Sequence, residues 1–145
     1  MEHCPENMSN SHSYDITVDW GDCDPAGIVF YPNFYRWMDR GFWLLFGSKG
    51  LTLETLRDRY KTLGGPLVDT GARFIQPIKP GDTLTVTSLI QKWGTKSFRL
   101  EYKFFHQTIL VAEGFEVRVW GTLQDAGSIT STAIPQEVKT FFQTD

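Results

Sequence analysis

The sequence has few cysteines, little net charge and no long hydrophobic run, and each deficit excludes a class of protein. The two cysteines, Cys4 and Cys23, form neither a disulfide framework nor a Cys-x-x-Cys motif. The formal net charge of -3 gives no basic surface for nucleic acid. No stretch approaches the ~20 apolar residues that span a membrane. The three histidines, His3, His12 and His106, lack the spacing of metal ligands.

The length and the polar N-terminus predict the domain organisation. A chain of 145 residues is typical of one domain and can bury a core without disulfides or metals. Residues 1–12 are polar, include Glu2 and Glu6, and lack the apolar core of a secretory signal. We therefore predict a flexible tail over 1–12, a single domain over 13–145 and a cytoplasmic location.

Alternation of apolar and polar residues predicts five β-strands. The first covers 13–20, with Tyr14, Ile16, Val18 and Trp20 on one side. The others cover 67–76, 83–93, 97–106 and 110–122, and short Pro/Gly turn signals separate the later ones, as between antiparallel strands. Residues 125–132 are predicted to form a polar loop.

A long apolar segment over 32–47 predicts one helix. Its apolar residues fall at spacings of three and four, and they are Phe34, Trp37, Met38, Gly41, Phe42 and Leu45. The rest of the helix is also unusually apolar, which predicts burial on most sides. Gly41 in mid-helix predicts a close approach of helix and sheet, because glycine there costs ~1 kcal/mol relative to alanine. Shorter helices are expected over 52–60 and 135–142.

These elements predict an α+β fold in which a five-stranded antiparallel sheet wraps around one long central helix. Such a sheet leaves edge strands open, and open edges are commonly covered or paired. Pairing of edges between two copies would form a homodimer, so we expect a homo-oligomer.

One stretch, from Gly21 to Trp37, combines a carboxylate with a helix start. Asp24-Pro25-Ala26-Gly27 predicts a turn, and Pro32 predicts the first helical position, which makes Tyr31 the N-cap. The free N–H groups of the first helical turn are expected to face outward. The carboxylate of Asp24 could act as a base or nucleophile, and the helix start could stabilise developing negative charge.

The same stretch resembles a known family. Asp22-Cys23-Asp24-Pro25-Ala26-Gly27-Ile28-Val29, followed by Tyr31-Pro32-Asn33, is similar to the 4-hydroxybenzoyl-CoA thioesterase family, whose members have the hotdog fold. The run Trp93…Lys96-Ser97-Phe98 also resembles that family, and the order of elements agrees over about 13–142.

The resemblance implies hydrolysis of acyl-CoA thioesters without a metal or redox cofactor. It implies that Asp24 is the catalytic carboxylate and that the backbone N–H of Tyr31 polarises the thioester carbonyl. It also implies dimers or tetramers whose sites lie between two subunits. Whether Asp24 attacks the carbonyl as a nucleophile or activates a water as a general base stays open.

The sequence departs from the family pattern at two places. Gly94 and Thr95 stand where basic residues contact the CoA phosphates, and Gly65 stands where a hydroxyl residue precedes the proline of the first central strand. The first departure weakens the expected phosphate contacts, and the second bears on contacts to the acyl group.

Further residues are candidates for substrate binding. Asp39, on the long helix, rivals Asp24 as the catalytic carboxylate, could contact a polar acyl group, or could be a solvated charge. Aromatic residues could line an acyl pocket or only pack the core; they are Phe30, Phe34 and Trp37. Lys96 and Ser97 could contact the pantetheine or phosphate arm, or form a solvated turn.

Two neighbours of Asp24 have simpler interpretations. Asp22 is interpreted as a cap at the end of a strand or a partner of a backbone N–H. Cys23 has no histidine nearby in the sequence, and the resemblance assigns it no role.

Three functions follow from these residues. The first is an acyl-CoA thioesterase that acts on aromatic, 4-hydroxybenzoyl-like, or short acyl groups. The second is a thioesterase for acyl-carrier proteins, motivated by the missing basic residues at Gly94 and Thr95. The third is a non-catalytic acyl-CoA-binding protein of the same fold.

Overall fold

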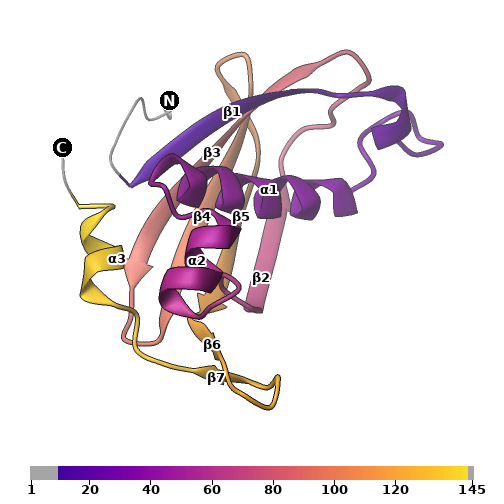
Figure 1. Cartoon of the computed structure of the whole chain (residues 1–145). Helices are drawn as coiled ribbons and strands as arrows, with labels where there is room; N and C mark the ends of the chain where they lie inside the picture. Colours follow the sequence, from indigo (N-terminus) through magenta and orange to yellow (C-terminus); the bar gives the residue numbers. More distant parts are fainter. Residues whose placement is uncertain (1–9, 144–145) are drawn as a thin grey trace.

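The computed structural model of the chain describes residues 10–143, and its largest element is a five-stranded antiparallel sheet. The strand order is β1–β3–β4–β5–β2, so β1 and β2 form the two edges (Figure 1). The strands are β1 (Ser11–Thr17), β2 (Leu67–Phe74), β3 (Thr83–Trp93), β4 (Ser97–His106) and β5 (Ile109–Val119). All five predicted strands are confirmed.

The first strand begins and ends earlier than its alternation predicts. It includes Ser11 and His12, which belong to the predicted tail 1–12; residues 1–9 of that tail lie outside the described residues. At its other end, the Asp19 side chain accepts a hydrogen bond from the N–H of Trp20 (2.8 Å) and starts a 3₁₀ turn, Trp20–Asp22. The predicted strand position of Trp20 is therefore wrong, and its side chain is 78% exposed.

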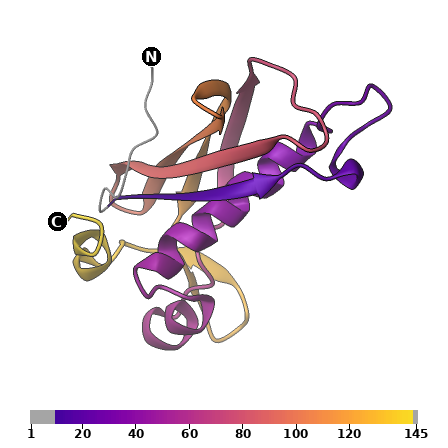
Figure 2. The same cartoon turned by 90° about the horizontal axis from the view of Figure 1, so that it is seen from above.

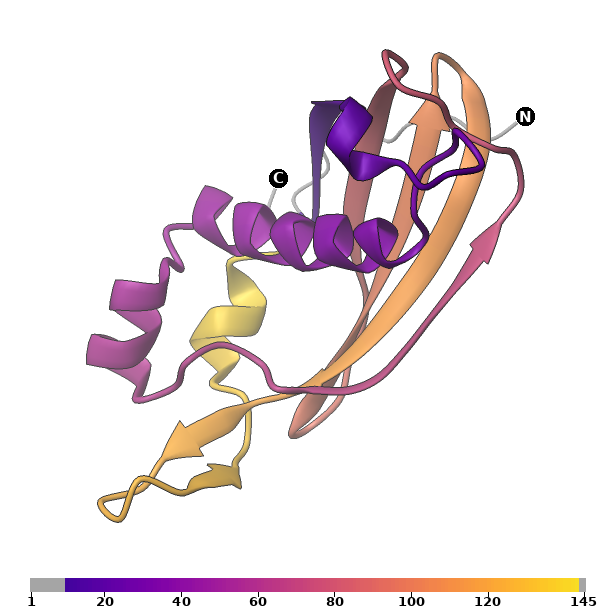
Figure 3. The ribbon, with the colours of Figure 1, turned by 90° about the vertical axis from the view of Figure 1, so that its right-hand side faces the viewer.

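A small hairpin follows β5. It consists of β6 (Gly121–Leu123) and β7 (Ile129–Ser131), so the prediction of a loop throughout 125–132 is wrong. Gly127 has a φ of +82° and lets the chain reverse, which closes the hairpin through the bond from Gln124 N–H to Ser128 C=O (2.9 Å). The hairpin extends beyond the main sheet (Figure 3).

The longest helix, α1 (Pro32–Ser48), lies against one face of the sheet (Figure 2). The six residues of its predicted apolar stripe are all buried. A Cβ at Gly41 would lie 2.3 Å from Ser88 Oγ on β3, which confirms the close approach of helix and sheet. Two shorter helices, α2 (Leu53–Tyr60) and α3 (Gln136–Thr140), complete the fold.

The two edges of the sheet differ in character. β1 has the polar sequence SHSYDIT, whereas β2 exposes large apolar side chains. Leu67 is 48% exposed, Val68 59% and Phe74 46%. An open apolar edge is suited to pairing with another strand. None of the helices in the described part of the chain is long and apolar enough to cross a membrane.

Candidate active site

The predicted turn at Asp24 is present and is anchored at both ends. Cys23 and Val29 form an isolated antiparallel bridge, and Asp24 N–H donates to Ile28 C=O (3.0 Å). Inside the loop, Gly27 N–H donates to Asp24 C=O (2.9 Å), and Gly27 has a φ of +78°. The loop therefore holds the Asp24 backbone in one position.

The carboxylate of Asp24 is only half engaged. Its Oδ1 accepts a hydrogen bond from Ala26 N–H (2.9 Å), and the side chain is partly exposed. Its Oδ2 has no hydrogen-bond partner within residues 10–143. One oxygen thus orients the group while the other can meet a substrate or a water.

The start of α1 offers one free amide. Tyr31 is the N-cap and Pro32 the first helical residue, as predicted. However, Asn33 N–H donates to Phe30 C=O (2.9 Å) and Phe34 N–H to Tyr31 C=O (3.1 Å). The expectation of several free N–H groups is therefore too broad, because in the described part of the chain only the Tyr31 amide is left without an acceptor in this turn.

Asp22 ties the Asp24 loop to the helix start. Its C=O accepts from Phe30 N–H (2.9 Å) and from Asn33 Nδ2 (2.8 Å). Its carboxylate accepts from Asp19 N–H (2.8 Å) and pairs with Arg36 (3.0 Å). These contacts support the interpretation of Asp22 as a capping residue rather than a reacting group.

Asp24 and Tyr31 line the same apolar pocket, which has a volume of about 360 Å³. The other lining residues are Ile28, Val29, Phe34, Phe74, Ile75, Gln76, Pro77 and Ile78. Asp24 also lines a second hollow of about 440 Å³, together with Trp20, Cys23, Pro25 and Gly27. Asp24 therefore borders two hollows.

The predicted aromatic residues take three different positions. Phe34 lines the pocket, Phe30 is 48% exposed beside Tyr31, and Trp37 is 4% exposed within the core. The structure thus does not bring Trp37 into this pocket. The pocket wall formed by 74–78 is not among the residues predicted from the sequence. A signal was present, because Gln76-Pro77 interrupts an apolar run there, and such an interruption indicates that the chain leaves its sheet.

A second cluster surrounds Arg118 on β5. Arg118 Nη2 lies 2.9 Å from Asp39 Oδ1, and Arg118 Nη1 donates to Gly65 C=O at 2.9 Å. Two predicted substrate-binding residues, Asp39 and Gly65, therefore meet at one guanidinium. Neither lines the pocket that contains Asp24.

The predicted CoA-binding residues lie near this second cluster. Ser97 begins β4, and the next residue, Phe98, pairs with Arg118. Lys96 is exposed, and its C=O accepts from Trp120 N–H (2.8 Å).

The two clusters lie at opposite ends of the sheet in one subunit. Val29, which lines the pocket with Asp24, donates its N–H to the C=O of Ile78 (2.8 Å), and Ile78 lies shortly before β3 begins. Ser97 starts β4, next to the end of β3. β3 and β4 run antiparallel for about ten residues, roughly 30 Å. Within one chain, Asp24 therefore lies far from Lys96 and Ser97, and neither Asp39 nor Gly65 lines its pocket.

Cys23 is poorly suited to nucleophilic chemistry. Burial, with the carboxylates of Asp22 and Asp24 adding to it, raises the pKa of the Cys23 thiol. Its Sγ lies 3.7 Å from Asp19 C=O. Because the thiolate is the nucleophilic form, these surroundings agree with the assignment of no role to Cys23.

Comparison with known proteins gives a consistent result. The model of the thioesterase-like superfamily matches residues 18–142. The 4-hydroxybenzoyl-CoA thioesterase of Pseudomonas sp. (strain CBS-3) is 31% identical over 90% of this chain and 96% of its own. A 1,4-dihydroxy-2-naphthoyl-CoA hydrolase of Prochlorococcus marinus (strain MIT 9515) is 32% identical over 72% of this chain and 75% of its own.

Solved structures agree with this comparison. The Pseudomonas 4-hydroxybenzoyl-CoA thioesterase superposes with a TM-score of 0.84, covering 91% of this chain and 99% of that one at 28% identity. A gentisyl-coenzyme A thioesterase superposes with a TM-score of 0.78, covering 88% and 99%, at 34% identity. The predicted hotdog fold is confirmed.

Proposed function

The chain belongs to the thioesterase-like superfamily, and from this premise we propose that it hydrolyses acyl-CoA thioesters to a free acid and CoA. The observation that carries the proposal is the apolar pocket that Asp24 and Tyr31 both line. Among the described residues, Asp24 has one carboxylate oxygen without a partner and Tyr31 has an amide without an acceptor. Relatives named for aromatic acyl-CoA substrates support an aromatic acyl group, with a short acyl group as the alternative.

Asp24 is proposed as the group that begins the reaction. As a nucleophile, its free Oδ2 would attack the thioester carbonyl, expel the CoA thiolate and leave an acyl–aspartyl anhydride that water then cleaves. As a general base, it would take a proton from the attacking water while the C–S bond breaks in the same way. The second hollow that Asp24 lines would give water a route to either step.

The Tyr31 amide is proposed to stabilise the oxyanion. Both routes place negative charge on the carbonyl oxygen as it becomes tetrahedral, and a fixed N–H donor at a helix start favours that charge. The neighbouring amides of the turn are already bonded to Phe30 and Tyr31 carbonyls. A single backbone donor is therefore available, and a side-chain substitution cannot remove it.

The apolar wall of the pocket is proposed to hold the acyl group. Phe34 and Phe74 approach each other with ring centroids 5.1 Å apart, and Val29 and Ile78 continue the wall. Aromatic rings favour edge-to-face or offset contacts with a further ring. Phe30, beside Tyr31, is proposed to contact substrate at the pocket entrance, whereas Trp37 supports Phe34 from the core at 5.5 Å.

The enzyme is proposed to be a dimer formed through the β2 edges. Antiparallel pairing of two β2 strands would place Leu67, where one strand begins, beside Phe74 of the other, where the pocket lies. The Arg118 cluster adjoins the start of β2 through Gly65. The two ends separated within one subunit would then meet between two subunits.

In the shared site, the second cluster would contact the parts of the substrate that Asp24 does not reach. Asp39 and Gly65 would contact the acyl group, and Lys96 and Ser97 the pantetheine or phosphate arm. The exposure of Asp39, whose side chain is 56% accessible, and of Lys96 supports this proposal.

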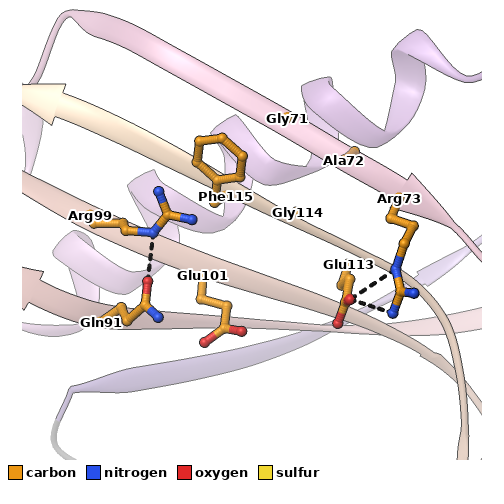
Figure 4. A pocket seen from close by; sticks show the side chains of 9 residues that line it. All are labelled: Gly71, Ala72, Arg73, Gln91, Arg99, Glu101, Glu113, Gly114 and Phe115. Atoms are coloured by element: carbon orange, nitrogen blue, oxygen red, sulfur yellow. Dashed lines mark hydrogen bonds and ion pairs between the residues drawn. The ribbon is translucent and has the colours of Figure 1, made fainter.

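A tetramer would need a further surface, and the outer face of the sheet offers one. It contains a hollow of about 420 Å³ on the side away from α1 (Figure 4). Arg73 pairs with Glu113 there at 2.7 Å, and Arg99 donates to the neutral side chain of Gln91 at 2.6 Å. Because three of its four charged lining residues, Arg73, Arg99 and Glu113, already have polar partners within the chain, this face is suited to a contact between dimers rather than to a charged ligand. We propose a homotetramer, with a cytoplasmic location where acyl-CoA is formed.

The direct test is a panel of acyl-CoAs assayed for released thiol, with matched acyl-carrier-protein thioesters beside it. We expect turnover of aromatic acyl-CoAs, with 4-hydroxybenzoyl-CoA and benzoyl-CoA as the first pair. Tight binding without thiol release would instead identify a non-catalytic acyl-CoA-binding protein. Faster turnover of carrier-protein substrates would support the second enzyme function.

Labelled water separates the two roles of Asp24. One turnover in H₂¹⁸O with enzyme in excess would place ¹⁸O in the Asp24 carboxylate if an anhydride forms and water attacks its aspartyl carbonyl. Label only in the product leaves either the general-base route or attack of water on the acyl carbonyl of the anhydride. Rapid-quench detection of an acylated peptide containing Asp24 then distinguishes those two.

A further inference from the structure

A buried arginine carries the polar interactions of the second cluster. The Arg118 side chain is 7% exposed and lies 4.0 Å over the ring of Phe42. Its guanidinium donates to both oxygens of Glu116 (3.0 and 3.1 Å), to Gly65 C=O and to Asp39. A planar guanidinium can serve several acceptors at once in a fixed geometry, which an ammonium group cannot do.

The inner side of this guanidinium is fixed by two further buried groups. Glu116 is 2% exposed, and its Oε1 also accepts a hydrogen bond from Tyr102 Oη (2.5 Å). Burial, with the Glu116 charge adding to it, raises the pKa of Tyr102 well above its ordinary value, so the phenol remains a donor. Tyr102, Glu116 and Arg118 therefore form a chain with every charged group paired.

On its solvent-facing side, the guanidinium donates to the carboxylate of Asp39, and the structure shows a partner for only one oxygen of that carboxylate. Asp39 uses Oδ1 for Arg118, and its Oδ2 has no hydrogen-bond partner in the described part of the chain. The bond to Arg118 takes one oxygen and leaves the other facing outward as an acceptor. A half-exposed aspartate on a helix would otherwise sample several rotamers.

The second outer contact leaves no room for a side chain. A Cβ at Gly65 would lie 2.8 Å from Arg118 Cβ and 3.1 Å from the ring of Phe98. The glycine therefore lets Arg118 reach the backbone carbonyl directly. One guanidinium thereby joins the middle of α1 to the segment that leads into β2.

We propose that Arg118 is a positioning residue that holds Asp39 as a fixed acceptor, and that this arrangement selects acyl groups carrying a hydrogen-bond donor. The inference rests on the proposed function, because it needs Asp39 to face the acyl group of a bound thioester. Arg118 itself does not touch the substrate. It acts through the orientation of Asp39 Oδ2 and the position of the Gly65 backbone.

Stability alone is a weak reason for this network. Burying several charged groups costs desolvation free energy, and well-packed apolar residues of similar volume often do as well. The position also faces the core, between the helix and the sheet, where an apolar side chain would pack against Phe42. A function at the exposed end of the network gives the buried charges a role.

The test compares selectivity rather than total activity. The measured quantity is the ratio of kcat/KM for 4-hydroxybenzoyl-CoA to that for benzoyl-CoA, in wild type, Asp39→Asn, Arg118→Lys and the double variant. Loss of a hydrogen bond to a charged acceptor is expected to lower the ratio by about 10-fold or more in Asp39→Asn. Arg118→Lys should lower it by about 5-fold or more, with benzoyl-CoA turnover within about twofold of wild type.

A matched control is Arg99→Lys. The Arg99 guanidinium also lies 4.0 Å over an aromatic ring, that of Phe115, but it is on the outer face of the sheet and has no carboxylate partner within residues 10–143. Its substitution should leave the ratio unchanged. If Arg118→Lys does not fold, the variant Glu116→Gln/Arg118→Gln removes both buried charges together and is expected to show the same loss of selectivity.

The outcomes separate the inference from its premise. A double variant no less selective than Asp39→Asn alone supports the positioning role, because both changes then remove one interaction. Equal losses on both substrates in every Arg118 variant, or a wild-type ratio in them while Asp39→Asn loses it, overturn the inference and leave the proposed function intact. A wild-type ratio in Asp39→Asn overturns the proposed contact of Asp39, and the inference with it.

Discussion

The two ends of the subunit are built in opposite ways. At the Asp24 end, a short loop and a helix start leave one carboxylate oxygen and one amide N–H without partners among the described residues. At the Arg118 end, buried charges satisfy each other and leave a single oxygen of Asp39 at the surface. The comparison teaches that a reacting carboxylate needs an oxygen without a hydrogen bond within the protein. A carboxylate that recognises substrate instead becomes more selective when a second residue fixes its orientation.

The largest expected effect is at the reactive end. Asp24→Asn should lower kcat by at least ~10²-fold, the low end for loss of a general base, and by more if Asp24 is the nucleophile. Binding of a non-hydrolysable acyl-CoA analogue should survive, because the apolar pocket is unchanged. Steady-state thiol release and calorimetric binding check both expectations.

The matched control for that variant is the carboxylate at the other end. Asp39→Asn should keep kcat on benzoyl-CoA within a fewfold of wild type, since it lies on the recognition side. Near-normal turnover by Asp24→Asn, in protein shown by mass spectrometry to be free of deamidation, would contradict the assignment of the reactive end.

Separation of the two subunits should break the site without unfolding the chain. Val68→Lys places a charge on the open β2 edge, where Val68 is 59% exposed. We expect a shift toward monomer in light scattering and a loss of kcat/KM of about 10-fold or more, because a step arranged by two subunits loses its positioning. Far-UV circular dichroism should remain that of wild type.

The polar edge gives the comparison for that experiment. Thr17→Lys adds the same charge to β1, at an exposed position beside Thr83. It should leave both oligomeric state and activity unchanged. A fully active Val68→Lys monomer would contradict the proposal of a site shared between two subunits.

A smaller effect, on stability, is expected at Gly65, which packs directly against Arg118. Gly65→Ala should destabilise the protein by about 1–3 kcal/mol, because the new methyl group overpacks a site already in contact. Gly47→Ala is the control, since a Cβ there meets nothing within 4 Å and alanine favours a helix. Urea unfolding of both variants should give changes of opposite sign, and equal stabilities would refute the tight packing at Gly65.

The smallest effect concerns the carrier arm of the substrate. Lys96→Ala should raise KM for acyl-CoA by about 2- to 5-fold and leave kcat nearly unchanged, because a contact remote from the carbonyl contributes mostly uniform binding. Gln107→Ala, at the opposite end of β4, serves as the surface control. A large loss of kcat with an unchanged KM would instead place Lys96 near the chemistry.

Local patterns in the sequence predict the fold and the backbone geometry at Asp24 well. Turn residues and the helix start depend on neighbours in the chain, so Asp24, Tyr31 and Pro32 could be placed from spacing alone. The strand positions followed from period-two alternation. The wrong strand position of Trp20 also has a local cause, because the cap made by Asp19 starts a 3₁₀ turn there and ends β1 earlier.

The recognition end could not be predicted in the same way. In β5, Phe115 and Val117 alternate with Glu116 and Arg118, and an apolar pattern would favour burial of the first pair. The structure instead buries Glu116 and Arg118, because Arg118 finds Asp39 on a helix 79 residues earlier in the chain. Pairing over that distance leaves no periodic signal, and the same holds for the pocket wall at 74–78.

The central claim is that the reactive end of one subunit meets the recognition end of its partner. A heterodimer of Asp24→Asn and Asp39→Asn, purified through two different tags, tests it most directly. A shared site predicts about half of the wild-type kcat with wild-type selectivity for 4-hydroxybenzoyl-CoA over benzoyl-CoA, because one of two sites is intact. Half of the activity with the reduced selectivity of the Asp39→Asn homodimer would show instead that each subunit uses its own two ends.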